Sequence, residues 1–398
     1  MSPSRQAAGQ GPTANPTGSS LDRRRFLIVL GGAAAHAALA PHAAWSRKLG
    51  LPLPALQPWT LPADPPASPL ELARALVGAA ILAPSNWNSQ PWRMEVDGGS
   101  IRLLADPTRA LPVTDPDRSG MLVSLGAALE NMLVTMRAYG LRPTVRYFPA
   151  GDSRGPVAEV TWTGDEARRD RQLFAAIPNR RTNRRSYDGR GIFMQNRAAL
   201  AAQMSEDLRL HWIGDRDQIR NVADLLQDAT RAQVLDAASE RERLAWMRFG
   251  DDQARERGDG VTVDDLELGG PARWFARRYF NPRSRFIGLG AGSAGKQARE
   301  AIGSSGALAL LTAPRRTEFS CLTGGQAYER FALKATQLGI AHQPMNAAIE
   351  VERFRPDLAR SFGAPGEHPL MLVRLGHAKR PRPSLRRAVA LVASFRNT

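Results

Sequence analysis

The sequence predicts a globular fold of mixed helices and strands, organised as two halves of one chain. The chain has 398 residues, of which 43% are hydrophobic and 23% are charged, and this size and composition suit two packed domains. Segments with helical and with strand patterning occur on both sides of the midpoint. An internal repeat at an offset of 199 residues is the third observation. The matched pairs are Gly126 with Gly325, Ala128 with Ala327, Glu130 with Glu329, and Gly140 with Gly339.

Composition and charge exclude several classes of protein. The hydrophobic and charged fractions are those of a globular chain, not of a disordered or polytopic membrane protein. One cysteine, Cys321, cannot form an intramolecular disulfide framework or a cysteine-rich metal site. The net charge of +16 is concentrated at the ends: residues 1–48 carry six basic residues and one acidic, and residues 377–398 carry six basic and none acidic. Because neither end interleaves aromatic with basic residues as nucleic-acid-binding segments do, we expect no nucleic-acid partner.

Residues 1–45 are predicted to be a leader that contributes nothing to the core. The first 21 residues are rich in Ser, Pro, Gly and Ala and are expected to be disordered. Arg23 and Arg24 then precede Phe26-Leu27 and an apolar run of 14 residues, which resembles a twin-arginine export signal. The run is too short for a stable membrane span, and the alternative to a signal is a core helix. We therefore expect recognition by the twin-arginine export machinery and a periplasmic location, or a cytoplasmic one if the signal does not function.

The first half, 46–165, begins with an extended arm and continues with alternating helices and strands. Residues 50–68 are rich in proline, which favours extended backbone. Apolar residues at helical spacing or in alternation define the elements that follow. They are a helix over 70–82 that stops before Pro84, a strand over 101–105, a helix through Leu122, Leu125, Leu129 and Leu133 that ends at Gly140, and a strand over 157–162. The charged segment 165–170 is expected to be a linker.

The second half, 166–398, repeats this mixture of elements. They are a strand over 208–213, helical segments over 221–249, buried strands over 307–311 and 370–375, and a helix over 325–338 that ends at Gly339. Between them, residues 250–298 are rich in Gly, Arg and Asp. Within this segment, 290–295 fits G-x-G-x-x-G, but no convincing βαβ unit surrounds it, so a dinucleotide site is not expected.

Residues 83–92, Ala-Pro-Ser-Asn-Trp-Asn-Ser-Gln-Pro-Trp, form the most specific string in the chain. The loop follows a helix end and offers short polar side chains. Ser85, Asn86 and Asn88 could hydrogen-bond the polar edge of a planar heterocycle while a tryptophan covers apolar area. The alternative is an ordinary helix-to-strand connector, in which Asn and Ser are common turn residues.

Residues 180–187, Arg-Arg-Thr-Asn-Arg-Arg-Ser-Tyr, form a second string. Several guanidinium groups interleaved with hydroxyls suit a phosphate, which arginine binds through two parallel hydrogen bonds. The run follows Pro178 and is placed near an expected helix start, where backbone amides also favour an anion. The alternative is a solvated basic loop.

The two strings resemble the Ala-Pro-Ser-x-x-Asn-x-Gln-Pro-Trp and Arg-Arg-Ser-x-Arg motifs of the nitroreductase superfamily, with Thr182 in place of Ser. The resemblance covers roughly residues 70–390 and is closest to the Acg-type branch, in which two nitroreductase-like halves lie on one chain. In this superfamily FMN binds between two subunits; one subunit supplies the Arg motif to the phosphate and the other supplies the loop to the isoalloxazine ring. The resemblance implies an α+β, nitroreductase-like fold whose fused halves form an intrachain pseudo-dimer. Because each half carries one of the two motifs, it also implies one complete FMN site.

The resemblance assigns cofactor-binding positions residue by residue, and it assigns no catalytic side chain, because the flavin carries the chemistry. In the two motifs these positions are Pro84, Ser85, Asn86, Asn88, Arg180, Arg181, Thr182 and Arg184. A turn at 342–347 adds Pro344 and Asn346, where the family has Pro-x-Glu-Gly. Near the C-terminus, Arg386 and Arg387 resemble the basic segment that closes on the phosphate.

The implied function is an FMN oxidoreductase that reduces an electron-poor small-molecule acceptor, such as a nitroaromatic or a quinone, with NAD(P)H as a possible donor. The alternative is a protein that holds FMN without steady turnover. Two features favour that alternative: the glycine-rich segment near 250–298 could form a lid that excludes substrate, and export would separate the protein from cytoplasmic NAD(P)H. A plain surface loop is the other interpretation of this segment. The six histidines show no metal-ligand spacing, so no metal is expected.

Overall fold

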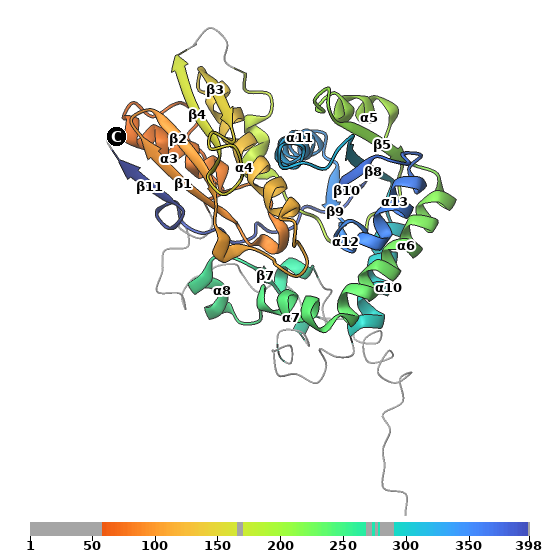
Figure 1. Cartoon of the computed structure of the whole chain (residues 1–398). Helices are drawn as coiled ribbons and strands as arrows, with labels where there is room; N and C mark the ends of the chain where they lie inside the picture. The colour runs from red at the N-terminus through yellow and green to blue at the C-terminus, as the bar shows by residue number, and fades with distance from the viewer. Residues whose placement is uncertain (1–57, 165–169, 268–272, 275–277, 279–289, 397–398) are drawn as a thin grey trace, which may run out of the picture.

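A computed structural model of the chain describes residues 58–164, 170–267, 273–274, 278 and 290–396 (Figure 1). The predicted export signal, the start of the proline-rich arm, most of the charged linker and residues 279–289 of the glycine-rich segment lie outside the described residues. The fold is α+β, as the sequence predicts, and it is framed by two separate sheets.

The first sheet has five strands in the order β11-β1-β2-β4-β3, and the second has four in the order β5-β8-β10-β9. The strands of the first sheet are β1 (Trp92–Asp97), β2 (Ser100–Ala105), β3 (Leu141–Tyr147), β4 (Pro156–Gly164) and β11 (Ala393–Arg396). Those of the second are β5 (Arg209–Ile213), β8 (Ala307–Ala313), β9 (Ala341–Pro344) and β10 (His368–Gly376). Within both sheets all pairings are antiparallel except that of β1 with β11.

Two long helices, α4 (Ser119–Ala138) and α11 (Glu318–Gln337), pack against each other between the sheets (Figure 1). The other helices are α3 (Pro69–Ala80), α5 (Met194–Ala201), α6 (Arg216–Leu235), α7 (Ala237–Ala245), α8 (Asp251–Arg257), α10 (Gly290–Gly303), α12 (Ala347–Glu350) and α13 (Arg355–Ser361). Short 3₁₀ turns are η3 (Asn86–Asn88), η4 (Pro107–Arg109), η6 (Phe174–Asn179), η7 (Asp264–Leu266), η9 (Glu352–Phe354) and η10 (Val389–Leu391). A two-stranded ribbon joins β6 (Met247–Arg248) to β7 (Val261–Thr262).

Strand β8 shows how the sequence builds these layers. All seven of its residues are buried, because both faces of the second sheet are covered. Ala309 and Leu311 point into the core shared with α4 and α11, whereas Leu308 and Leu310 point into a second core formed with α6 and α13. A strand covered on both faces is therefore apolar along nearly its whole length, and its one polar side chain, Thr312, donates to Glu367.

The central helices cross at a pair of glycines, and the contact is reciprocal. A Cβ atom on Gly126 would lie 1.9 Å from the carbonyl oxygen of Leu322, and a Cβ atom on Gly325 would lie 2.0 Å from the carbonyl oxygen of Val123. Each glycine thus faces the residue three positions before its repeat mate. Only glycine allows two backbones to approach this closely.

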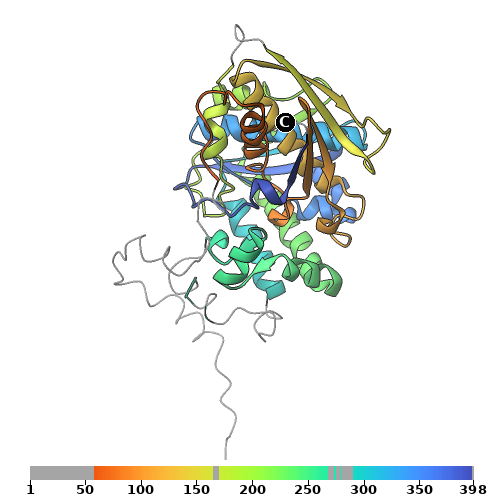
Figure 2. The same cartoon turned by 90° about the vertical axis from the view of Figure 1, so that its left-hand side faces the viewer.

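The first sheet is completed by the end of the chain. Strand β11 runs parallel to β1, with Met94 opposite Ala393 and Val96 opposite Phe395. Figure 2 shows this dark blue strand beside the orange first strands of the fold. The predicted division into 46–165 and 166–398 therefore cuts through a sheet, since its fifth strand comes from the second range.

Several expected elements differ in extent or kind from those observed. The helix expected from Gly325 starts at Glu318, where Thr317 and Ser320 form a capping box. The loop expected at Gly290–Gly295 is wrong, because these residues begin α10, which packs on α6. The helical segment expected over 221–249 ends in strand β6. Its Met247 and Arg248 are buried, so tertiary contacts override the local helical preference.

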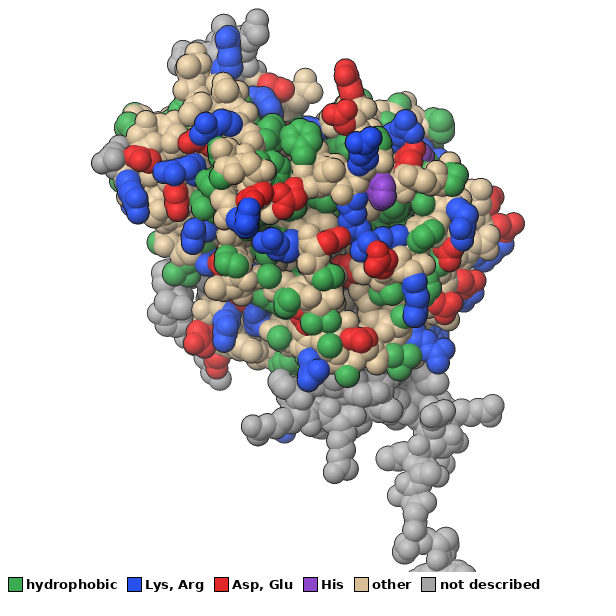
Figure 3. Space-filling view, viewed as in Figure 1, with side chains coloured by type: hydrophobic (Ala, Val, Ile, Leu, Met, Phe, Trp, Pro, Cys, Tyr) green, Lys and Arg blue, Asp and Glu red, His purple; other side chains and the backbone are tan. Residues whose placement is uncertain are grey.

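One helix in the described part of the chain, α4, is long and apolar enough to cross a membrane by length and composition, and it is buried in the core of this fold. On the surface, Arg side chains alternate with Asp and Glu side chains over the face seen in Figure 3. This mixed pattern agrees with the concentration of excess positive charge in the two ends of the sequence.

Candidate functional site

A pocket is lined by residues from both sequence ranges, 46–165 and 166–398, and it includes about 900 Å³ of space, part of it open to solvent. Its walls come from the loop before η3, the N-terminal half of α4, the segment after η6, the segment from β9 to α12, and β10. The residues predicted to bind a cofactor that line it are Pro84, Ser85, Asn86, Thr182, Arg184, Pro344 and Asn346. The two motifs, nearly 100 positions apart in the sequence, thus face one space.

The loop from Ser85 to Gln90 has an unusual backbone. Trp87, Asn88 and Gln90 have φ values of 50°, 52° and 53°, in the left-handed region that non-glycine residues rarely adopt. Such conformations cost free energy and persist only where the surroundings hold them. Here the backbone N–H of Gln90 donates to the Ser85 hydroxyl at 2.9 Å, and this hydrogen bond closes the loop.

The left-handed turn directs Asn88 away from the pocket, toward other segments of the chain. Its side-chain amide donates to the carbonyl oxygens of Gly260 at 2.9 Å and Leu385 at 3.2 Å, and its Oδ1 accepts from Arg386 at 3.0 Å. Asn88 therefore ties the loop to the β6–β7 ribbon and to the C-terminal segment. Its role as a ring contact stays a prediction.

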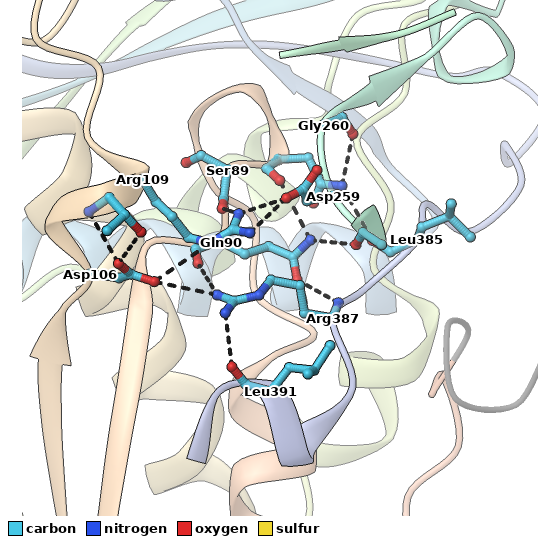
Figure 4. Close-up of polar contacts among 12 residues, drawn as sticks. Ser89, Gln90, Asp106, Arg109, Asp259, Gly260, Leu385, Arg387 and Leu391 are labelled. Atoms are coloured by element: carbon cyan, nitrogen blue, oxygen red, sulfur yellow. Dashed lines mark hydrogen bonds and ion pairs between the residues drawn. The ribbon is translucent and has the colours of Figure 1, made fainter. Parts of the chain in front are cut away.

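A polar network fixes the outer side of this loop (Figure 4). The side-chain Nε2 of Gln90 donates to the carbonyl oxygen of Gly258 at 2.9 Å. The side-chain Oε1 of Gln90 accepts from the backbone N–H of Arg387 at 2.9 Å. The Arg387 guanidinium lies 3.7 Å from Asp106 and donates to the Leu391 carbonyl at 2.8 Å. Arg387 lies outside the pocket lining, and its contacts are those of a structural residue.

Asp259 is the buried anchor of the same network. Its side chain is 2% exposed, and one oxygen accepts two hydrogen bonds from Arg109 at 2.7 and 2.8 Å. The other oxygen accepts two from Arg248, at 2.5 and 3.0 Å. Arg109 also donates to the Ser89 carbonyl at 2.6 Å, so the ribbon is locked onto the loop. No sequence signal marks Asp259, because its partners lie 11 and 150 positions away.

Three predicted phosphate ligands meet at a buried cluster that we call the arginine cluster: Arg180, Arg181 and Arg386. The guanidinium carbons of Arg181 and Arg386 lie 4.0 and 4.8 Å from the ring centroid of Trp59. Arg180 and Arg386 also donate to the Leu82 carbonyl, each at 3.2 Å. The structure thus unites the two basic strings, which the sequence places about 200 positions apart.

The arginine cluster has more donors than acceptors. Among the described residues, Arg180 Nε and Nη1, Arg181 Nε and Arg386 Nε are buried and have no hydrogen-bond partner. Burial, aided by the neighbouring arginines, lowers the pKa of Arg181 and of Arg386 to about 9 each. Buried guanidinium groups with unused N–H donors are costly unless an anion satisfies them.

The arginine cluster adjoins the pocket through Tyr328, which lines it. The Tyr328 hydroxyl is buried, has no hydrogen-bond partner among the described residues, and feels the charges of Arg180, Arg184 and Glu329. Arg184 lines the pocket and donates to the Asp265 carbonyl at 3.3 Å. His342 lies beside Tyr328, and burial, with Arg180, lowers its pKa to about 3, so this histidine is neutral at physiological pH.

The opposite end of the pocket holds charged residues that sequence reasoning missed: Asp115, Asp117, Arg316, Glu350 and Arg355. Arg316 lies 3.1 Å from Asp117, and Asp115 accepts the backbone amides of Gly120 and Met121, each at 2.8 Å, at the start of α4. These residues come from three separate segments, and no local motif joins them.

Glu350 links this end of the pocket to the loop from Ser85 to Gln90. Its oxygens accept from the side-chain amides of Asn86 at 3.1 Å and Gln233 at 2.6 Å. Burial raises the pKa of Glu350, and these two hydrogen bonds oppose the rise. Because a carboxylate accepts, Asn86 must turn its amide nitrogen toward Glu350, which orients its oxygen the other way.

The described residues offer little for other chemistries. No group of three or more His, Cys, Asp or Glu among them is arranged to hold a metal ion. Burial raises the pKa of Cys321 to about 11, so its thiol is a packing group and not a nucleophile.

Sequence comparison finds relatives among mycobacterial proteins. No family model matches the chain. It is 29% identical over 316 residues to the protein named "Putative NAD(P)H nitroreductase Rv3131" of Mycobacterium tuberculosis, covering 77% of this chain and 86% of that one. It is 33% identical over 116 residues to the protein named "Putative NAD(P)H nitroreductase acg" of the same organism, covering 29% of this chain and 35% of that one. These relatives support the resemblance to the nitroreductase superfamily carried by the two motifs.

Among solved structures, the FMN-dependent nitroreductase NfnB of Mycobacterium smegmatis in complex with NADPH covers 56% of this chain and 96% of its own. It has a sequence identity of 16% and a TM-score of 0.36.

Proposed function

We propose that the chain is an FMN-dependent oxidoreductase of the nitroreductase type, which reduces an electron-poor acceptor such as a nitroaromatic or a quinone with electrons from NAD(P)H. One observation carries this proposal: buried arginine N–H groups without partners adjoin a pocket that is lined by the loop predicted to bind a flavin ring. FMN suits this arrangement because it joins a planar heterocycle to a terminal phosphate. When bound, FMN would supply the hydride or electron transfer.

The chain's own residues would bind and orient the cofactor. Arg184 and Thr182 line the pocket on the side of the arginine cluster and would hold the phosphate, with Arg180 and Arg386 as further cationic groups. Charge-assisted hydrogen bonds of this kind are about twice as strong as neutral ones. The preorganised cations would therefore fix one end of the cofactor.

The opposite wall would hold the ring. Pro84, Pro344 and Met371 supply apolar surface, and Asn86 presents its amide oxygen because Glu350 takes the amide nitrogen. Contacts within the protein hold the strained loop in shape, so we expect that binding need not order it. No protein side chain is proposed to act as a nucleophile.

We further propose that the two halves are a fused pseudo-dimer and that the chain acts as a monomer. The reciprocal glycine contacts at the α4–α11 crossing support this proposal, because a two-fold axis between related subunits produces such pairs. Glu130 and Glu329, also repeat mates, are both buried on these helices.

The absorbance spectrum of the purified chain tests the cofactor proposal most directly. We expect the flavin bands of bound FMN, and bleaching by excess NAD(P)H under argon. Bleaching by dithionite but not by NAD(P)H would favour the alternative function, a protein that holds FMN without steady turnover. A chain purified or reconstituted without any flavin would contradict both.

Export by the twin-arginine route is a separate proposal. It is supported by Arg23-Arg24 and the apolar run that follows. Replacing both arginines by lysine keeps the charge but removes the planar guanidinium, so we expect the protein to stay in the cytoplasm with its flavin bound. Fractionation with periplasmic and cytoplasmic markers measures this. Export of the Lys-Lys variant would contradict the proposal.

A further inference from the structure

Glu329 is the one carboxylate in contact with the arginine cluster among the described residues, and it is held loosely. Its side chain is 0% exposed and Arg180 is 2% exposed, and the closest contact between them is 3.4 Å, from Nε to Oε1. Neither carboxylate oxygen makes a hydrogen bond of good geometry among the described residues, although the side chain of Asn131 interacts with the carboxylate and lowers its pKa. A buried ion pair normally survives only when further hydrogen bonds satisfy both groups, and this one lacks them.

The repeat mate of Glu329 shows the contrast. Glu130 is 1% exposed, and its Oε2 accepts from Arg330 at 2.9 Å and from Gln326 at 3.0 Å. Glu130 is therefore a fully satisfied structural carboxylate. The same position in the other half carries a carboxylate without this support, next to cations that also lack partners.

Charged and polar groups face Glu329 from several elements. Arg180 and Arg386 come from the segments after η6 and before η10, and Asn131 and Glu130 come from α4. Arg180 also lies near His342 of β9, which is neutral. The surplus of positive charge around Glu329 therefore comes from arginines that cannot lose their protons near neutral pH. Glu329 is the group that can respond when the local charge changes.

We propose that Glu329 is the exchangeable counter-ion of the phosphate subsite: when the phosphate of FMN binds, Arg180 turns from the carboxylate to the phosphate, and the Glu329 carboxyl takes up one proton from solvent. This inference rests on the proposed function. The only covalent bond formed is the O–H bond of the Glu329 carboxyl, and a buffer acid gives up the proton for it.

The direction follows from electrostatics. Burial raises the pKa of Glu329 to about 7, with Arg180 opposing the rise. A phosphate dianion close to the same guanidinium adds negative charge and removes that opposition, so the pKa rises further on binding. The protonated fraction of the Glu329 carboxyl is then smaller in the free chain than in the FMN complex. FMN affinity should fall as the pH rises above about 7, by up to roughly tenfold per pH unit where a full proton is taken up.

Titration calorimetry of the full-length, flavin-free chain measures the number of protons taken up when FMN binds. FMN is titrated at pH 7.5 in two buffers of different ionisation enthalpy, and the slope of the observed enthalpy gives the protons taken up. A phosphate monoester is already a dianion there, since its second pKa is near 6. We expect an uptake of roughly 0.5–1 proton per FMN. Riboflavin, which lacks the phosphate, should bind with an uptake near zero.

Two variants locate the proton. Glu329→Gln should bind FMN without uptake and with an affinity that does not fall above pH 7. The matched control, Glu130→Gln, should keep the wild-type uptake. An uptake that persists in Glu329→Gln, or equal uptake with riboflavin and FMN, overturns the inference. The riboflavin comparison needs no variant, so the test stands even if Glu329→Gln fails to fold.

The result also separates this inference from the proposed function. FMN binding without proton uptake by the wild type overturns the counter-ion role of Glu329 and leaves the oxidoreductase standing. A chain that binds no FMN at any pH overturns both.

Discussion

At the scale of single residues, two glycines set the distance between the central helices. Gly126 and Gly325 stand out in the sequence as members of a repeat, but their contact partners could not be predicted. A repeat reports that two positions are alike, and says nothing of which backbone each one meets. The structure shows that each faces a carbonyl of the other helix.

Replacing either glycine by alanine should destabilise the fold strongly. The new Cβ would meet a backbone oxygen at 1.9 or 2.0 Å, so the helices must separate. We expect a loss of about 3 kcal/mol or more in the free energy of unfolding, measured by denaturant titration. Gly78→Ala in α3 is the control: nothing lies within 4 Å of its Cβ, and alanine should stabilise the helix by up to about 1 kcal/mol. Equal stability of Gly126→Ala and wild type would contradict the close crossing.

The phosphate contacts are also tested at single residues. Arg184→Ala and Arg181→Ala should each weaken FMN retention by roughly 10- to 150-fold without unfolding the chain, because one lost charge-assisted hydrogen bond costs about 1.5–3 kcal/mol. Equilibrium dialysis of FMN measures the loss. Arg220→Ala, at an exposed position on α6, is the control. Unchanged retention in both Arg181→Ala and Arg184→Ala would leave the basic run without a role in binding.

At the scale of elements, the loop from Ser85 to Gln90 depends on a ribbon from the other half. The sequence singles out this loop by its motif, but not its left-handed backbone or the contacts that hold it. Those contacts reach Gly258, Asp259 and Gly260, more than 160 positions away. Local patterning carries no information on such distant partners.

Asp259→Asn should therefore loosen the loop. It leaves the buried side chain of Arg248 without its counter-charge and Arg109 with Asp106 alone, and removing one partner of a buried pair costs about 3–5 kcal/mol. We expect a lower unfolding free energy and weaker FMN retention together. Asp252→Asn, whose side chain is 98% exposed, should change neither. Wild-type stability of Asp259→Asn would show that the ribbon does not hold the loop.

The second sheet contains a separate acid-sensitive contact. Glu367 accepts from Arg209, His211 and Thr312, at 2.5, 2.8 and 2.5 Å. Burial would raise its pKa, but these hydrogen bonds outweigh burial and lower the pKa of Glu367 to about 2. A carboxyl with a depressed pKa stabilises the fold above its unfolded pKa near 4.5, and this stability is lost as the pH falls toward about 2.

Glu367→Gln should accordingly lower the unfolding free energy at pH 7 by about 1–2 kcal/mol, and the difference from wild type should vanish as the pH approaches 2. Urea titrations at several pH values measure it. Glu71→Gln, at an exposed site on α3, is the control. A difference that grows as the pH falls would contradict the assigned sign.

At the scale of the whole molecule, the two proposed halves differ at matched positions of the repeat. Ala127 lines the pocket, whereas its repeat mate Gln326 is held by Glu130 and by the hydroxyl of Tyr147, 3.0 Å away. A large hydrogen-bonded side chain thus stands where the other half leaves room. The two-fold relation at the helix crossing is therefore broken at this pair of positions.

We therefore expect one FMN per chain and a monomer in solution. Flavin extraction with chromatography gives the stoichiometry, and light scattering gives the mass. A ratio near two, FAD as the only flavin, or an obligate dimer would contradict the fused pseudo-dimer.

The sequence predicts the central helices α4 and α11 and the strands β2, β4, β5, β8 and β10, because their apolar residues repeat at regular spacing, but it does not predict β1, β3, β9 and β11. Helix α10 was missed because glycine-rich sequence favours loops, and packing on α6 overrides that preference. The two motifs predict five residues that line the pocket, and the turn at 342–347 adds Pro344 and Asn346. The charged end of the pocket could not be predicted, because Asp117, Arg316 and Glu350 converge only in three dimensions.

The pairing of β11 with β1 has a consequence for synthesis. Translation releases β1 about 300 residues before β11, so the edge of β1 that β11 covers stays unpaired while the intervening chain is made. An unpaired edge invites pairing with other chains. A nonsense mutation just before β11 would then leave a chain in which this edge of β1 is permanently unpaired. We expect such a chain to collect in inclusion bodies, although the residues it lacks lie far along the chain from the pocket loop.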